Sequence, residues 1–468
     1  MLKNRNIHLA KNVAIFALGN LGTKIISFFL VPVYTNALTA SQYGTIDLVN
    51  AIGLVMIPLL TCNIAEAVVR FCMDDDANLN SILCITLSTW IIALLIGLCF
   101  VPVLLHIELL REYALLVYLC TVTTAGSQLF LYYLRGREQL LKYSIGNLLY
   151  AILVALLNIV FLLWFNWGIS GYFLAYILSN TIVMLYAFLE GRMWKYFLPF
   201  NIDYKLFGRM VKYSAYLIPN SVMWWIINSS DRIMLSAMVN NEANGIFSIA
   251  YRVPTLLSSL TMIFTQAWSY TALDAEKSED RIAYNNLVFD KVVSFVYILA
   301  AALLLVTKPF MKIYVEASFF EAWKYVPLLT IGFVFNTIST FIGTSYTVQK
   351  DSKGAMASAT AGAIVNLVLN FCLINTIGIA GAASATAISY IVVFVYRAID
   401  TRKYLPLHIL QKKHIVGIVV LLLMAASVYI EGKLGQCLLI FEFALMIINA
   451  RAIITKIFAL VNKWFKRS

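Results

Sequence analysis

The sequence predicts an all-α integral membrane protein, and three observations support this prediction. The 468 residues are 61% hydrophobic and only 12% charged, whereas soluble domains contain about a quarter charged residues. The apolar residues gather in runs of about 20, the length that crosses a bilayer. Lys and Arg collect in short strips between these runs, as they do beside membrane helices. The net charge of +12 is therefore interpreted as basic helix flanks and not as a nucleic-acid-binding surface.

We expect about fourteen transmembrane helices. The predicted spans are 12–36, 44–69, 81–105, 113–134, 143–165, 169–190, 213–239, 245–270, 287–307, 325–349, 355–375, 378–398, 415–430 and 435–455. The N-terminal run is long enough to span, so it is interpreted as a retained first helix and not as a signal peptide. Hinges of only a few residues join the adjacent spans at 165/169 and at 375/378.

The distribution of Lys and Arg predicts the orientation of the chain. If the N-terminus is inside, the cytoplasmic strips hold 27 of the 35 Lys and Arg residues and the outside strips hold 5. Cytoplasmic loops are the ones that carry such an excess. The prediction is a multi-pass protein of a bacterial cytoplasmic (inner) membrane with both termini in the cytoplasm.

Several classes of protein are excluded by what the sequence lacks. The seven cysteines contain no CxxC spacing and lie mostly in apolar runs, so we predict neither a metal site nor a cofactor. No GxxxxGK[ST] motif is present, and ATP hydrolysis by this chain is not expected. The short outside loops lack paired carboxylates. A transporter is therefore favoured over an enzyme.

An internal repeat divides the predicted helices. The segment from Leu38 to Gly44 aligns with that from Val239 to Gly245 at an offset of 201, and Gly168-Ile-Ser-Gly171 aligns with Gly378-Ile-Ala-Gly381 at an offset of 210. Both matches place each copy at the same point of a six-span half. An even number of spans per half predicts two parallel six-helix lobes.

The repeat sets the predicted domain boundaries. We expect an N-terminal six-helix lobe at 1–190, a cytoplasmic amphipathic connector at 191–212, a C-terminal six-helix lobe at 213–398, and helices 13 and 14 with a basic tail at 399–468. Within the spans, Pro58 permits a bend because proline removes a backbone hydrogen bond. Gly354, Ser358 and Gly362 form a face of small residues that predicts close helix packing.

Four charged residues within the spans are the main candidates for a site. A charge at mid-bilayer costs at least about 2.5–3.5 kcal/mol, so it tends to face a cavity or a partner. Lys24 lies halfway along span 1, and Arg232 and Arg252 lie in the outer halves of spans 7 and 8. We expect Lys24 and Arg252 to face a cavity. Asp231 either pairs with another helix while Arg232 faces the cavity, or the roles are reversed.

Other polar residues have simpler interpretations. Asp47 is interpreted as a charge near a helix N-terminus, where the helix dipole favours an acid. Glu66 and Arg70, spaced i,i+4, are interpreted as a local ion pair. Amides in the spans either line a sugar path or form hydrogen bonds between helices; they are Asn158, Asn366 and Asn370.

These features together resemble a known family. Gly19-Asn-Leu-Gly22, Leu38-Thr39-x-x-x-Tyr43-Gly44 and Asp231-Arg232 are similar to motifs of Wzx-type polysaccharide flippases of the multidrug/oligosaccharidyl-lipid/polysaccharide (MOP) superfamily. The resemblance implies two MATE-like lobes around a central cavity, alternating access, and a glycan substrate carried on undecaprenyl pyrophosphate. Lys24 and Arg252 would then contact the diphosphate. Related lipid II flippases carry Arg in spans 1, 2 and 8, whereas span 1 here has Lys and span 2 has no mid-membrane cation, which disfavours lipid II.

Three functional hypotheses follow. The first is a flippase for a lipid-linked oligosaccharide of cell-surface polysaccharide biosynthesis (O-antigen, capsule or exopolysaccharide), with membrane lipids, a polysaccharide polymerase and glycosyltransferases as partners. The second is a MATE-like small-molecule or drug exporter, which an acidic cavity would favour. The third is a membrane glycosyltransferase, which the short outside loops disfavour. The basic character of the deeply placed charges favours the flippase.

Overall fold

The fold was analysed in a computed structural model, which describes residues 22–74, 76–106, 111–197, 200–261, 268, 281–349 and 351–450. Parts of the predicted first and eighth spans, the loop after 268 and the basic tail lie outside these residues. The described elements are all helical, with no strand among them. The chain packs as two compact units, residues 1–225 and residues 226–468. The predicted all-α class is confirmed.

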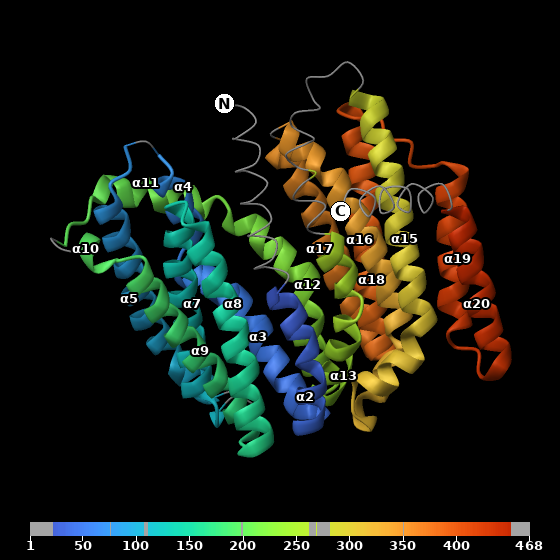
Figure 1. Cartoon of the computed structure of the whole chain (residues 1–468), viewed down its shortest axis with the longest axis horizontal. Helices are drawn as coiled ribbons and strands as arrows, with labels where there is room; N and C mark the ends of the chain where they lie inside the picture. Colours follow the sequence, from blue (N-terminus) through green and yellow to red (C-terminus); the bar gives the residue numbers. More distant parts are fainter. Residues whose placement is uncertain are drawn as a thin grey trace, which may run out of the picture. The chain divides into compact units, whose positions relative to one another are not determined.

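The first unit contains ten helical elements among its described residues, before the helix that crosses the unit boundary. These are α2 (Val31–Ala37), α3 (Ala40–Leu60), α4 (Ile64–Cys72), α5 (Leu79–His106), α7 (Ala114–Gly136), α8 (Leu140–Asn158), the π-helix η1 (Ile159–Trp164), α9 (Gly168–Glu190), α10 (Trp194–Phe197) and α11 (Tyr204–Ala215). Helix α9 packs on α7 and α8, and α7 packs on α4 and α5. Figure 1 shows these helices in shades of blue and green.

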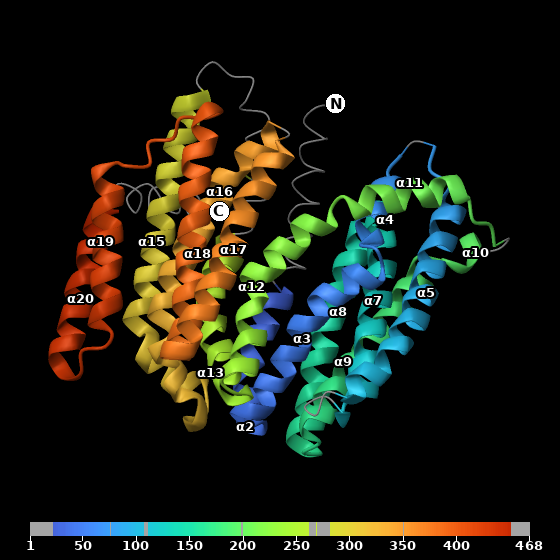
Figure 2. The same cartoon turned by 180° about the vertical axis from the view of Figure 1, so that it is seen from behind.

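Helix α12 (Ile218–Met238) begins in the first unit and ends in the second. The other described elements of the second unit are α13 (Asn241–Arg252), α15 (Arg281–Tyr314), η2 (Ala317–Lys324), α16 (Val326–Val348), α17 (Ser352–Ile377), α18 (Ile379–Asp400), η3 (Thr401–Lys403), α19 (Lys412–Ser427) and α20 (Gly432–Asn449). Helix α18 packs on α16 and α17. The hairpin of α19 and α20 packs on α15 at the edge of this unit (Figure 2).

Ten helices of the described residues are long and apolar enough to cross a membrane. Most predicted spans correspond to one helix to within a few residues, but span 2 does not. It divides into α3 and α4, because Cys62 and Asn63 adopt left-handed φ values of 49° and 51°. The Asn63 amide then donates to the Pro58 carbonyl, with 2.6 Å between nitrogen and oxygen. Such a six-to-one bond ends a helix, so a single helix from 44 to 69 was a wrong prediction.

The two anchors of the sequence repeat have matching local structure. Thr39 caps α3 and Asn240 caps α13, each accepting a hydrogen bond from the backbone of its own first turn. Gly168 and Gly378, which begin the hinges before α9 and α18, have φ values of +53° and +56°. Glycine is the residue that enters this region at little cost. The predicted hinges are therefore present at aligned positions of the two units.

The core of the first unit lies where α4, α5, α7, α9 and α11 meet. Ile64 and Val68 of α4 are completely buried, as are Leu83 of α5 and Tyr133 of α7. The Tyr133 hydroxyl donates to the Leu79 carbonyl at 3.1 Å, which satisfies the polar end of a buried ring. In a bilayer, where lipid is as apolar as these side chains, close packing and such bonds hold helices together.

Helix α11 has the amphipathic character predicted for the connector. Its buried side chains are Leu206, Met210 and Ser214, spaced four residues apart on one face. Its Lys and Arg side chains are exposed; they are Lys205, Arg209 and Lys212. The Asp203 carboxylate caps the helix by accepting from the backbone of Lys205 and Leu206 at 2.8 and 3.1 Å. Figures 1 and 2 both show α11 lying across the ends of α4 and α5.

Candidate functional site

A fully buried carboxylate lies at the centre of the second unit. Asp231 of α12 has no exposed surface. Its Oδ1 accepts from Asn366 Nδ2 of α17 at 3.2 Å and from Asn370 Nδ2, and its Oδ2 accepts from Thr386 Oγ1 of α18. One carboxylate therefore joins three helices that are more than a hundred residues apart in sequence. Asp231 pairs with other helices, as one of the two predicted alternatives proposed.

The hydrogen bonds continue beyond the carboxylate. Asn370 Nδ2 donates to Asn366 Oδ1 at 3.0 Å, and Ser230 Oγ donates to the same oxygen at 2.7 Å. Asn366 is thereby held by groups from two helices. The Asn370 Oδ1 atom is buried and has no hydrogen-bond partner in the described structure. A buried acceptor without a donor is costly, so this oxygen is available to a proton donor or to a cation.

A second layer of aromatic residues covers the same part of α12. The Tyr390 hydroxyl donates to Asn228 Oδ1 at 2.7 Å and lies 3.0 Å from the Tyr251 hydroxyl. The Arg232 guanidinium lies over the Tyr251 ring, 5.0 Å from its centroid, and donates to the Asn228 carbonyl at 3.0 Å. Sequence reasoning missed Thr386, Tyr251 and Tyr390, because a threonine or tyrosine in an apolar helix is normally a packing residue.

The chemistry available at Asp231 is the binding of a small cation or a proton. A buried carboxylate is unfavourable while charged and unpartnered. The surrounding amide and hydroxyl oxygens are hard donors of the kind that alkali and alkaline-earth ions prefer. No group of three His, Cys, Asp or Glu residues that could hold a metal occurs in the described part of the chain. The site therefore suits a single positive charge better than a multivalent metal.

The predicted cavity cations belong to different units. Lys24 lies in a helical stretch at 22–29 of the first unit and is exposed. Arg252 ends α13 in the second unit and is half-buried. Arg232 is also half-buried, beside Asp231. That Lys24 and Arg252 face one shared cavity stays a prediction.

Two of the simpler interpretations were wrong. Asp47 is the eighth residue of α3 and is buried, whereas the helix dipole acts mainly within the first turn. Thr39 and Gln42 cap this helix instead. Arg70 pairs with Asp74 and not with Glu66, because Asp74 lies one turn further along, just beyond the end of α4. The Asp74 carboxylate raises the pKa of Arg70 through this hydrogen bond.

Asn158 lies at a change of helix type. It is fully buried at the end of α8, where the π-helix η1 begins. Its Nδ2 donates to the Val154 carbonyl at 2.7 Å, and its Oδ1 has no hydrogen-bond partner within the described residues. Short π segments often occur at functional sites. Asn158 therefore remains a candidate, separate from the Asp231 cluster.

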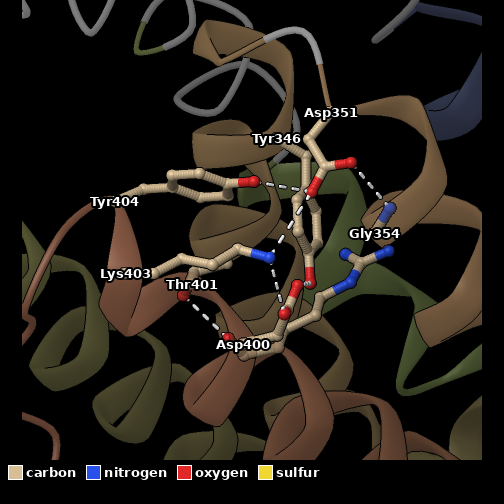
Figure 3. Close-up of polar contacts among 8 residues, drawn as sticks. Tyr346, Asp351, Gly354, Asp400, Thr401, Lys403 and Tyr404 are labelled. Carbon is tan, nitrogen blue, oxygen red and sulfur yellow. Dashed lines mark hydrogen bonds and ion pairs between the residues drawn. The ribbon is translucent and has the colours of Figure 1, made fainter.

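A further polar cluster joins the ends of α16, α17 and α18 (Figure 3). Tyr346 donates to Asp400 Oδ2 and Tyr404 donates to Asp351 Oδ2, both at 2.8 Å. Lys403 Nζ lies 2.8 Å from Asp400 Oδ1 and 3.8 Å from Asp351 Oδ2. The Gly354 amide, followed by the Tyr404 hydroxyl, lowers the pKa of Asp351. This cluster fixes helix ends and is interpreted as structural.

The predicted face of small residues packs on α18. A Cβ added to Gly354 would lie 2.5 Å from both Asp351 Oδ2 and Tyr346 Cε1, and one added to Gly362 would collide with Val393 Cγ2. Ser358 Oγ accepts from Arg397 Nε at 3.0 Å. Close packing along α17, predicted from this spacing, is confirmed.

Replacing Gly354 with alanine is expected to destabilise the protein by about 1–3 kcal/mol, as overpacking usually does. Thermal unfolding of the purified protein in detergent measures the effect. Gly208→Ala in α11 is the matched control, because a Cβ there meets nothing within 4 Å. Gly208→Ala should leave the melting temperature unchanged or raise it slightly. Equal melting temperatures for the two variants would contradict the assignment of a packing role to Gly354.

Comparison with solved structures defines the class of protein. The lipid II flippase MurJ in an inward closed conformation superposes with a TM-score of 0.70 at 14% identity, covering 97% of this chain and 100% of that chain. An inward-facing multidrug MATE transporter of the MOP superfamily gives 0.61 at 13% identity, covering 83% and 95%. The MATE transporter VcmN of Vibrio cholerae gives 0.55 at 13% identity, covering 85% and 98%. The fold is that of the MOP superfamily.

Sequence comparison then identifies the family. Residues 9–270 match the sequence model described as polysaccharide biosynthesis protein, and the chain belongs to this family. A curated relative from Haloferax volcanii, named "Probable low-salt glycan biosynthesis flippase Agl15", is 25% identical over 191 residues. That alignment covers 39% of this chain and 39% of the relative. The predicted resemblance to polysaccharide flippases of the MOP superfamily is confirmed.

Proposed function

We propose that this protein is a flippase that moves an oligosaccharide linked to undecaprenyl pyrophosphate across the bacterial cytoplasmic membrane. Its product would serve cell-surface polysaccharide biosynthesis, and its partners would be the glycosyltransferases and polymerase of that process. The observation that carries the proposal is the family match, which covers more than half of the chain. The fold shared with MurJ supports it, because large lipid-linked glycans can be moved by this architecture.

The mechanism would be alternating access between the two lobes. Lys24 and Arg252 would bind the diphosphate, one cation from each unit. A ligand shifts a conformational equilibrium only as far as it binds one state better than the other. A dianionic group that contacts both units in one state only would provide this difference. The membrane-depth cations would then be kept for their role in binding, since unpaired charges at that depth are costly.

The Asp231 cluster would couple transport to an ion gradient. Asp231 joins α12 to α17 and α18 through hydrogen bonds that a charged carboxylate accepts. Binding of a proton or of Na⁺ would change these bonds and hence the packing of the three helices. The buried Asn370 Oδ1 without a partner supplies a further ligand. Asp231 would therefore be the residue whose charge state distinguishes the two conformations.

A flipping assay tests the proposed function. The purified protein is reconstituted into vesicles with undecaprenyl-pyrophosphate-linked N-acetylglucosamine that carries a dithionite-quenchable fluorophore on the sugar. In protein-free vesicles dithionite reaches only the outer leaflet. Vesicles with the protein should lose nearly all fluorescence, because the inner-leaflet lipid is brought out. Quenching that stops at the protein-free level would contradict a flippase, and export of a small organic cation by the same vesicles would favour the MATE-like alternative.

A further inference from the structure

An apolar passage runs through the side of the first unit. One cavity of about 200 Å³ lies between α3, α5 and α7, and a second of about 400 Å³ lies between α3, α4, α5 and α11. Both are lined by Met56, Leu60 and Phe100, so the two cavities adjoin at these side chains. Together they follow α3 from Val49 to Leu60, which is about 16 Å of helix. This is roughly half of the hydrocarbon thickness of a bilayer.

The wall of this passage offers hydrocarbon and little else. The few polar side chains that line it use their hydrogen-bonding groups within the protein. Thr89 donates to the Ile85 carbonyl at 2.8 Å, Thr121 to the Val117 carbonyl at 2.9 Å, and Tyr118 to the Leu94 carbonyl at 3.0 Å. Such a passage cannot satisfy a sugar or a phosphate. Its occupant must itself be apolar.

The break between α3 and α4 forms part of this passage. Cys62 lines the second cavity and is exposed. Its left-handed φ turns the chain away from the axis of α3, so that Ile64 of α4 closes one side of the cavity. A non-glycine residue in this region is strained. The passage therefore depends on a backbone feature that a continuous helix would not provide.

The same passage ends at a basic helix. Phe207 and Val211 of α11 line the second cavity, while Lys205, Arg209 and Lys212 of this helix are exposed. Each Lys or Arg near a membrane surface attracts an anionic lipid headgroup by about 1 kcal/mol. A cationic surface followed by a narrow apolar passage matches an amphiphile with one chain and a multiply charged head. A phospholipid, with two chains and a smaller charge, matches it less well.

We infer that this passage holds the polyprenyl chain of the lipid-linked substrate, with the diphosphate drawn to the cations of α11. The inference rests on the proposed function and adds a substrate-chain site to it. Gly53 supports the assignment, because no heavy atom lies within 4 Å of the position that a Cβ would take there. That free space accommodates the methyl branches of an isoprenoid chain. The site lies wholly in the first unit and is separate from Asp231.

Cys62 provides a natural probe of the passage. The full-length protein in lipid nanodiscs is treated with N-ethylmaleimide, and the alkylation rates of individual cysteines are read by mass spectrometry. Undecaprenyl diphosphate, without a glycan, should slow the alkylation of Cys62 by about tenfold at ten times its dissociation constant. Cys99 of α5 is the internal reference, because it is exposed but lines neither cavity. Its rate should not change.

Filling the passage should abolish this protection. Gly53→Phe is expected to shift the protecting concentration at least tenfold upward, whereas Leu54→Phe, at a neighbouring exposed position, should leave it unchanged. Unprotected Cys62 in a protein that still flips the fluorescent lipid would overturn the inference but not the function. Protection of Cys62 without flipping would leave the chain site standing and contradict the function. Equal protection by phosphatidylglycerol or by inorganic diphosphate would also overturn the inference.

Discussion

Replacing Asp231 with asparagine is expected to remove the dependence of transport on an ion gradient while the protein still folds. The amide has the size of the carboxylate. Its oxygen can accept from Asn366 and Asn370, and its nitrogen can face Thr386 Oγ1, which also accepts. The helix contacts are thereby kept. The charge that would bind a proton or Na⁺ is lost, because a neutral amide neither titrates nor pairs strongly with a cation.

The size of the effect follows from the lost interaction. A hydrogen bond or contact to a charged group contributes about 1.5–3 kcal/mol, so the gradient-driven rate should fall roughly tenfold to a hundredfold. The flipping assay is run with an imposed pH gradient at constant Na⁺, and then with a Na⁺ gradient at constant pH. The gradient that accelerates the wild type should have no effect on Asp231→Asn. Glu242→Gln, the same chemical change at an exposed position of α13, is the control and should respond like the wild type. An unchanged gradient response in Asp231→Asn would exclude the coupling role.

Local features of the fold could be predicted from the sequence because short motifs determine them. Gly168 and Gly378 predicted hinges, and both adopt positive φ. Thr39 and Asn240 stand at aligned positions and cap their helices. The break in span 2 was missed because the left-handed positions hold Cys62 and Asn63 and not glycine. Pro58 indicated a bend but not a complete end of the helix.

The candidate site was predicted only in part, because its contacts are remote in sequence. Asp231 could be chosen as a buried charge, and Asn366 and Asn370 share a helix face at i,i+4. Nothing in the local pattern indicated that Asp231 and Thr386, separated by 155 residues, would meet. The errors at Asp47 and Arg70 have a different origin. Each has two plausible local partners, and a boundary error of a few residues decides between them.

Removing the two predicted cavity cations is expected to abolish glycan export. Lys24→Ala alone should lower export roughly tenfold to a hundredfold, the loss of one charged hydrogen bond to the diphosphate. Lys24→Ala with Arg252→Ala should leave none detectable. Lys24→Arg should retain part of the activity, because arginine keeps the charge but changes the donor geometry. Surface glycan in a strain that lacks the chromosomal gene measures export, and membrane levels of each variant are measured in parallel.

The comparison separates charge from packing. Alanine removes both the cation and its methylene chain, whereas arginine keeps the charge and most of the volume, so partial rescue by arginine assigns the loss to charge. Lys324→Ala is the control for loss of a cation in general. Lys324 is half-exposed and forms a surface ion pair with Glu321 at 2.8 Å, and such pairs contribute little. Normal export by the double variant would exclude diphosphate binding at Lys24 and Arg252. Because the two residues belong to different units, their joint requirement would also show that one substrate headgroup engages both units during transport.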